Sequence, residues 1–177
     1  MACGWRPIQR YADAVLDLLD MKACNPSTSP KLDKQTEPED EQLSDQPARF
    51  RSCVGILLYL ARRRPDLQAV LRWLCKRARE SDRNAERQLH KVARYLKGTL
   101  DLATFVPKDG NIEEITGYVD GDWGCDDYDR KSVSGGFIMI GGARLHSHSR
   151  TTAQHALSSG ESEVMALSEL LKVAKLM

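Results

Sequence analysis

The chain has 177 residues, enough for one ordinary domain or for two small or incomplete ones. Its 41% hydrophobic and 29% charged residues are typical of a soluble globular protein, and no apolar run could span a bilayer. The start MACGWRPIQR lacks the apolar core of a secretory signal, so we expect an intracellular protein, cytoplasmic or nuclear, with no membrane partner.

The first predicted element is a short amphipathic helix from Pro7 to Asp20, because its apolar residues recur at helical spacing. The following stretch from Asn25 to Pro47 is rich in Pro, Ser, Thr and acids, with almost nothing to bury. Such a composition predicts a linker, or a loop that lies over some other surface.

Three further helices are predicted between Phe50 and Gly98. Apolar stripes run from Phe50 to Ala61, from Leu67 to Cys75 and from Ala85 to Leu96. The first of these helices ends before Pro65, and the last is closed by Gly98 at a C′ position.

A basic block coincides with these three helices, although the formal net charge of the chain is only +1. Between Arg49 and Lys97, fourteen lysines and arginines stand against four acids. The block suits a phosphate-binding surface, because neutralised phosphates release counterions; the alternative is a solvated face of amphipathic helices. The candidate nucleic-acid-binding residues are Arg62, Arg63, Arg64, Arg83, Arg87, Lys91, Arg94 and Lys97.

After Gly98 the pattern becomes strand-like, with short β-branched or aromatic runs separated by Gly, Asp and Ser. The predicted strands are Leu102 to Val106, Ile115 to Val119, Gly136 to Ile140 and Ala143 to His148. A last helix then begins at a capping box formed by Ser158 and Glu161. Its predicted apolar side consists of Val164, Leu167, Leu170, Leu171 and Ala174.

Two acids are candidates for catalysis. Asp120 ends a predicted strand, and Glu163 lies in the first turn of the last helix, close to its apolar side. Carboxylates that converge in this way suit two-metal phosphodiester hydrolysis with Mg²⁺. The alternative is structural, since acids in a first helical turn are favoured by the helix dipole.

Histidines and cysteines carry weaker signals. Strand alternation places His146 and His148 on one face, and we interpret them, with His155, as ordinary polar residues and not as a zinc site. The five cysteines are scattered without a CxxC pair, which predicts buried or incidental free thiols.

Several segments resemble the Pol polyproteins of copia-type retrotransposons. Two segments resemble the end of the reverse transcriptase: FRSCVGILLYLARRRPDL and ARYLKGTLDL. Three later blocks resemble the RNase H motifs in the family's order: GYVDGDWG, DRKSVSGG and ALSSGESEVMAL. The resemblance covers roughly residues 9 to 177. It implies RNA cleavage in an RNA–DNA hybrid with Mg²⁺, Asp120 as the first metal-ligating Asp, and Glu163 as the catalytic Glu.

Departures from the family pattern matter as well. In the segment LHSHSRTTAQHALSS, His148 lies near the position where the family usually has a Trp. The nucleotidyl-transfer motif YxDD of the reverse transcriptase is absent from the sequence. The family fold implies two further Asp residues, which this sequence does not contain after its last helix. We therefore expect the chain to be inactive by itself, with the remainder of a Pol polyprotein as a potential partner.

The predicted architecture is α+β: a helical thumb or connection segment, then an incomplete RNase H-like α/β domain with a mixed sheet and a helix. The predicted parts are 1–48, an N-terminal helix and linker; 49–100, the basic helical segment; and 101–177, the partial RNase H-like domain. Two alternatives to an RNase H-related fragment remain: a non-catalytic nucleic-acid-binding remnant, or a non-functional product of a decayed element.

Overall fold

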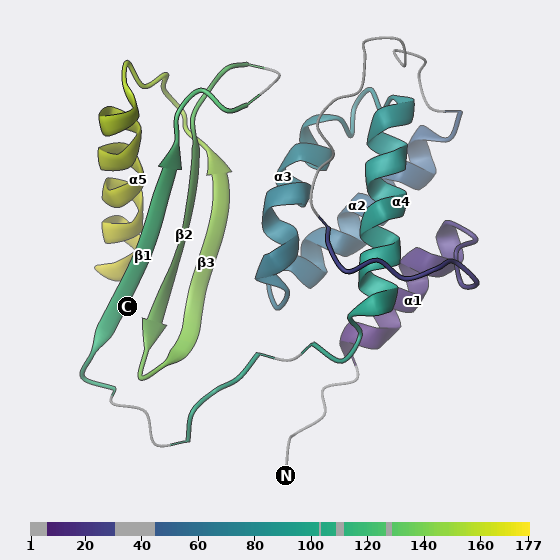
Figure 1. Ribbon diagram of the computed structural model, residues 1–177, viewed down its shortest axis with the longest axis horizontal. Helices are drawn as coiled ribbons and strands as arrows, with labels where there is room; N and C mark the ends of the chain where they lie inside the picture. The colour runs from purple at the N-terminus through teal and green to yellow at the C-terminus, as the bar shows by residue number, and fades with distance from the viewer. Residues whose placement is uncertain (1–6, 31–44, 103, 109–111, 127–128) are drawn as a thin grey trace. The chain divides into compact units, whose positions relative to one another are not determined.

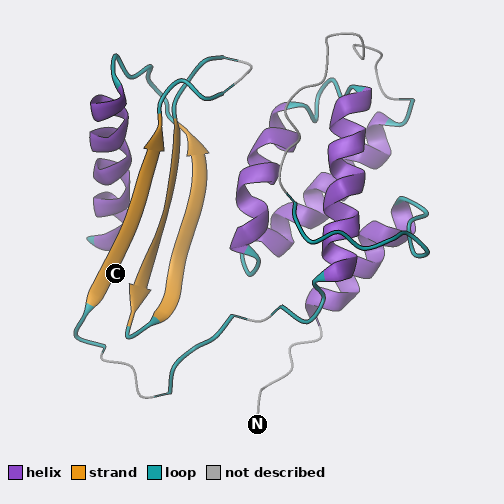
Figure 2. Ribbon diagram, viewed as in Figure 1, coloured by secondary structure: helices purple, strands orange, loops and turns teal. Residues whose placement is uncertain are grey.

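The computed structural model describes residues 7–30, 45–102, 104–108, 112–126 and 129–177. The chain divides into two units, Met1–Leu102 and Ala103–Met177. The first unit is helical, and the second contains a sheet and one helix (Figure 2). The first two predicted parts, 1–48 and 49–100, thus contribute to one unit.

Four α-helices form the helical unit, as the apolar spacing predicts. Proline at the first turn favours the start of α2, and the Asp82 side chain caps α4 by accepting a hydrogen bond from the Ala85 amide at 2.6 Å. The elements are α1 (Pro7–Leu18), α2 (Pro47–Ala61), a 3₁₀ turn (Pro65–Leu67), α3 (Gln68–Lys76) and α4 (Arg83–Gly98) (Figure 1).

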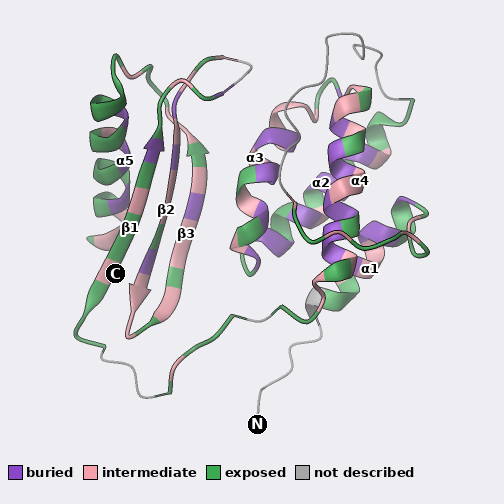
Figure 3. Ribbon diagram, in the orientation of Figure 1, coloured by how far each residue is buried: buried purple, intermediate pink, exposed green. Residues whose placement is uncertain are grey.

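The apolar stripes of these helices meet in one core (Figure 3). Helix α1 packs against α2 and α4, so the predicted first helix belongs to the same core as the basic segment. Burial of these stripes is the main source of stability for the unit. The largest fully buried side chains are Phe50, Leu57, Leu60, Leu67, Leu71, Leu74, Leu89 and Leu96.

Gly98 does not have the predicted C′ position. It is the last residue of α4, and Thr99 is the C-cap. A Cβ at Gly98 would lie 2.8 Å from the Ser27 carbonyl oxygen, so the glycine admits the backbone of residues 26–27 against α4. The described start of the predicted linker therefore lies on the helix, while residues 31–44 are outside the described part of the chain.

The described residues of the second unit form three strands and one long helix: β1 (Ile115–Asp122), β2 (Val133–Ile140), β3 (Ala143–Thr151) and α5 (Ser159–Ala174). Both strand pairs are antiparallel, in the order β1-β2-β3. The described sheet is therefore not mixed as predicted, because short connections join consecutive strands. The predicted strand Leu102–Val106 is also wrong: its described residues form a loop, and Phe105 is 78% exposed.

Helix α5 packs on one face of the sheet (Figure 1) through a side that shares only Leu170 with the predicted apolar side. Ser162, Ala166 and Leu170 are buried, whereas Val164, Leu167 and Leu171 of the predicted apolar side are exposed. The reason is close approach: a Cβ at Gly117 or Gly136 would lie only 3.0 or 3.3 Å from the Leu170 side chain. Ser162 and Ala166, together with the Leu170 side chain, therefore face the glycine-rich strands.

The described residues contain no helix that is both long enough and apolar enough to cross a membrane. Four cysteines lie in the described ranges, Cys24, Cys53, Cys75 and Cys125, and none of them forms a disulfide bond. This confirms the predicted thiols for these four positions, while Cys3 lies outside the described residues.

Candidate active site

The backbones of β1 and α5 come into direct contact at Gly121. The Ser162 hydroxyl donates a hydrogen bond to the Gly121 carbonyl at 3.0 Å, and both residues are buried. A Cβ at Gly121 would lie 2.6 Å from the Ser162 carbonyl oxygen and 2.9 Å from the Glu163 nitrogen. Only glycine permits this approach, which fixes the start of α5 against the end of β1.

The two predicted acids flank this contact. Asp120 precedes Gly121 in β1, and Glu163 follows Ser162 in α5, so the structure brings their backbones together. Because strand side chains alternate, Gly121 faces α5 and Asp120 projects from the opposite face. That face is open at this point, since a Cβ at Gly135, the register partner of Asp120, would meet no atom within 4 Å.

Both carboxylates are exposed, and among the described residues neither forms a hydrogen bond or ion pair. Glu161 differs from Glu163 in this respect. Its Oε2 accepts a hydrogen bond from the Leu157 amide at 2.6 Å, and its own amide donates to the Ser158 hydroxyl at 3.2 Å. The predicted capping pair is therefore present, with Glu161 bound to Leu157, one residue before the cap. Glu163 remains available for a ligand.

Oxygen ligands from Asp120 and Glu163 suit Mg²⁺, which usually retains several water ligands. Within the described ranges, no group of three or more Asp, Glu, His or Cys side chains could hold a metal ion. Asp122 is exposed further along β1. Asp126 is buried, and its carboxylate accepts a 3.5 Å hydrogen bond from the Thr151 hydroxyl. The structure thus brings the backbones of Asp120 and Glu163 together, with Asp120 on the face of the sheet opposite α5.

The histidines lie away from these acids. His146 and His148 share one face of β3, as alternation predicts, and their ring centroids are 5.6 Å apart. His148 Nε2 lies 3.2 Å from the Ser134 hydroxyl of β2. His155 is exposed in the loop before α5. No sequence pattern predicts the Ser134–His148 pair, because the pair depends on strand register.

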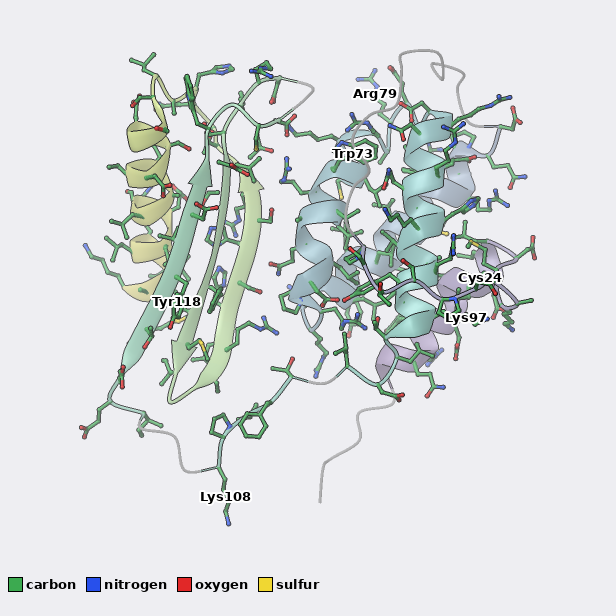
Figure 4. The ribbon with its side chains drawn as sticks, in the orientation of Figure 1. Cys24, Trp73, Arg79, Lys97, Lys108 and Tyr118 are labelled. Atoms are coloured by element: carbon green, nitrogen blue, oxygen red, sulfur yellow. The ribbon has the colours of Figure 1, made fainter. Side chains whose placement is uncertain are left out.

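The basic candidates fall into two groups. Arg64 is only 3% exposed, and its guanidinium binds the Asp66 carboxylate and Thr99. Arg94 donates to the Asn25 carbonyl at 2.8 Å, and Lys97 donates to the Cys24 carbonyl at 2.7 Å (Figure 4). These three residues hold the helical unit together. The solvent-facing candidates are Arg62, Arg63, Arg83, Arg87 and the half-buried Lys91.

The fold and these side chains define a two-unit α+β protein with an exposed pair of carboxylates at a strand–helix contact. The chain belongs to the family of copia-type retrotransposon Pol polyproteins. It is 32% identical over 160 residues to the retrovirus-related Pol polyprotein from transposon RE2 of Arabidopsis thaliana, which covers 88% of this chain and 11% of that polyprotein. The predicted resemblance is thus confirmed.

Two shorter relatives match as well. An uncharacterized mitochondrial protein of Arabidopsis thaliana, AtMg00810, is 28% identical over 158 residues, covering 89% of this chain and 65% of that protein. Secreted RxLR effector protein 161 of Plasmopara viticola is 34% identical over 126 residues, covering 71% of this chain and 88% of that protein. No family model and no solved structure matches the chain.

Proposed function

We propose that the sheet unit is an RNase H-like part of a Pol polyprotein, and that Asp120 and Glu163 bind a divalent cation for cleavage of RNA in an RNA–DNA hybrid. The observation that carries this proposal is the Gly121–Ser162 contact, which holds two exposed carboxylates on adjacent backbones. Family membership supports the same reading, because the motifs around both acids match in order.

The chemistry requires a cation that activates a water and stabilises the leaving oxygen. Asp120 and Glu163 would each contribute carboxylate oxygens, and Gly121 and Ser162 would hold the two backbones at a fixed separation. Two carboxylates leave a two-metal site short of ligands. Efficient hydrolysis therefore requires carboxylates in addition to Asp120 and Glu163, and the proposed role of these two residues is to form half of the site.

Manganese binding, measured by the electron paramagnetic resonance signal of free Mn²⁺, tests the half-site directly. We expect the chain to bind Mn²⁺ weakly, and Asp120→Asn or Glu163→Gln to weaken binding about tenfold, since each removes a charged ligand. Glu114→Gln is the matched control, because this exposed acid precedes the other end of β1. If all three variants bind like the unmodified chain, the carboxylates are not ligands.

Cleavage of a labelled RNA–DNA hybrid in Mg²⁺ and in Mn²⁺ tests the rest of the proposal. We expect no cleavage above the buffer rate from this chain by itself. Cleavage that disappears in both Asp120→Asn and Glu163→Gln would support the RNase H class and contradict the half-site, because a complete site would then form. Cleavage that persists in both variants would come from a contaminant.

A second candidate function is nucleic-acid binding by the outer side of α4. Arg83, Arg87 and Lys91 follow one another at four-residue spacing, so they share one side of the helix. Arg83 and Arg87 are exposed and Lys91 is half-buried. A row of cations at this spacing suits consecutive phosphates of a nucleic-acid backbone.

The salt dependence of hybrid binding tests this side of α4. Arg83→Gln with Arg87→Gln should weaken binding and reduce the slope of log affinity against log salt by about two. Arg10→Gln with Arg51→Gln is the control, because it removes two exposed arginines from α1 and α2. Equal slopes for the two double variants would exclude a specific role for α4.

A further inference from the structure

A cavity of about 500 Å³ lies in the sheet unit between the end of β3, the loop that follows it, and α5. Neither Asp120 nor Glu163 lines it. Its charged lining residues are Arg150 on β3 and Glu169 and Lys172 on α5. The cavity is therefore separate from the proposed active site, and two of its three charged residues are cations.

His148 also lines the cavity and is only 9% exposed. Its Nε2 lies 3.2 Å from the Ser134 hydroxyl, but its buried Nδ1 has no hydrogen-bond partner among the described residues. A buried polar nitrogen without a partner is costly. This cost is removed if a group in the cavity accepts a hydrogen bond from Nδ1.

Arg150 is a second cationic group at the cavity, and the Glu169 carboxylate lies near enough to interact with its charge. It lies two residues after His148 on the same face of β3, in register with Ser134. Among the described residues, its guanidinium forms no hydrogen bond or ion pair. Arginine presents several N–H groups in a planar fork that fits tetrahedral oxyanions.

We propose that this cavity binds a phosphate group carried by a small organic molecule, with Arg150 and Lys172 contacting the phosphate oxygens and His148 donating from Nδ1. The Met165 side chain, which also lines the cavity, supplies an apolar surface for the organic part. A phosphomonoester thus matches the lining in both charge and polarity.

Glu169 does not prevent this binding. Lys172 Nζ lies 2.7 Å from Glu169 Oε1, and the two side chains are 67% and 49% exposed. An ion pair with that exposure is weak in water, so Lys172 can contact a phosphate without a large loss. Arg150, Glu169 and Lys172 all line the cavity, so a ligand there can contact both cations.

Binding should depend on the protonation of His148. Burial lowers the pKa of His148, the positive charges of Arg150 and His146 lower it further, and Glu169 opposes them. Lys172 on α5 and Ser134 on β2 also lie around the same cavity. A phosphate beside the ring favours the imidazolium, so ligand binding should raise the pKa of His148 and should be tighter at lower pH.

Titration of the full chain with inorganic phosphate and with adenosine monophosphate, followed by calorimetry, tests the site. We expect saturable binding of both, with tighter binding of the nucleotide because its organic part contacts Met165. Arg150→Gln should weaken both affinities about tenfold or more. Arg144→Gln is the matched control, because Arg144 lies on β3 outside the cavity and donates to the Ser147 hydroxyl.

Equal affinities for the Arg150→Gln and Arg144→Gln variants would overturn the proposal, and so would the absence of saturable binding by the unmodified chain. If inorganic phosphate binds as tightly as the nucleotide, the site does not recognise an organic part. A second readout uses no variant: the Cε1 proton resonance of His148, followed against pH by nuclear magnetic resonance. Its pKa should rise when phosphate is added, and an unchanged pKa would exclude contact with His148.

Discussion

Gly121 is the residue on which the contact between β1 and α5 depends. A methyl group there would lie 2.6 Å from the Ser162 carbonyl oxygen, closer than van der Waals contact allows. Because backbone atoms on both sides cannot move independently, Gly121→Ala should separate the strand from the helix. The same change should displace Asp120 relative to Glu163.

We predict that Gly121→Ala lowers the free energy of unfolding of the sheet unit by about 1–3 kcal/mol, the usual cost of overpacking. Hydrogen exchange of the β1–β3 amides, recorded at increasing urea concentrations, measures this free energy of unfolding. Gly135→Ala is the control, because a Cβ at Gly135 meets no atom within 4 Å on the open face of the sheet. Comparable losses in the two variants would contradict the close-packing argument.

Arg64 is the second residue with a defined structural role. Its guanidinium binds Asp66 at 2.8 Å and the Thr99 carbonyl at 2.9 Å, and it lies over the Tyr95 ring at 5.5 Å. Its sequence context, RRRP, does not distinguish it from Arg62 and Arg63. Only the tertiary structure shows that this arginine is buried and connects the 3₁₀ turn with the end of α4.

Arg64→Ala should therefore lower the free energy of unfolding by about 2–4 kcal/mol, somewhat less than for a fully buried pair because Asp66 is partly exposed. Arg62→Ala, two residues away and exposed, should change it by less than about 0.5 kcal/mol. Circular dichroism during urea denaturation gives both values. If Arg62→Ala costs as much as Arg64→Ala, general charge effects explain the loss.

The same ion pair predicts a pH dependence. Burial by itself raises the pKa of Asp66, but hydrogen bonds from Arg64 and Tyr95 and the Arg64 charge outweigh it, so the pKa lies below the ordinary carboxyl value. The pair's stabilisation is then complete above the unfolded pKa of about 4 and decreases as the pH falls through the lower folded pKa. Asp66→Asn should remove this part of the acid dependence in denaturation curves recorded from pH 5 downwards.

At the scale of elements, α5 depends on its first turn. Ser158 accepts a hydrogen bond from the Glu161 amide, and Glu161 in turn accepts one from the Leu157 amide. Ser158→Ala should destabilise the helix by about 1 kcal/mol, the usual cost of losing an N-cap. Ser159→Ala, at the first helical residue, should have little effect. Chemical denaturation of both variants separates capping from a general effect of removing a hydroxyl.

At the scale of the whole molecule, the two units differ greatly in their apolar cores. Among the described residues, the buried apolar side chains of the sheet unit are Ile138, Ala166 and Leu170, whereas the helical unit has a continuous core drawn from all four helices. Since buried apolar area is the main stabilising contribution, we expect the sheet unit to be the less stable one.

Hydrogen–deuterium exchange followed by mass spectrometry tests this difference, because amides report the opening of each unit separately. Amides of α2 and α4 should exchange more slowly than those of β1–β3. Equal protection in both units would indicate one cooperative transition and contradict the prediction. Uniformly fast exchange would instead favour a non-functional product of a decayed element.

The sequence by itself determined the helices of the first unit, the strands that contain the motifs, the cap of α5 and the family. These features depend on the spacing of apolar residues and on side-chain to backbone hydrogen bonds within a few residues. Both can be read from residues that are close together in the sequence. It also indicated Asp120 and Glu163 as candidate ligands. In the structure Asp120 lies two residues before the end of β1, and Glu163 follows the first turn of α5, in which Glu161 is the acid.

The tertiary structure alone decided which side of α5 is buried, which arginine is enclosed, and where the cavity at His148 lies. Apolar spacing indicates Val164, Leu167, Leu170, Leu171 and Ala174 for the buried side. Of these five only Leu170 is buried, beside Ser162 and Ala166, because the glycines of β1 and β2 admit that side of the helix. Similarly, packing decides that Arg64 is buried among the three arginines, and strand register decides that Ser134 lies opposite Arg150. These properties arise between residues far apart in the chain, where local patterns carry no information.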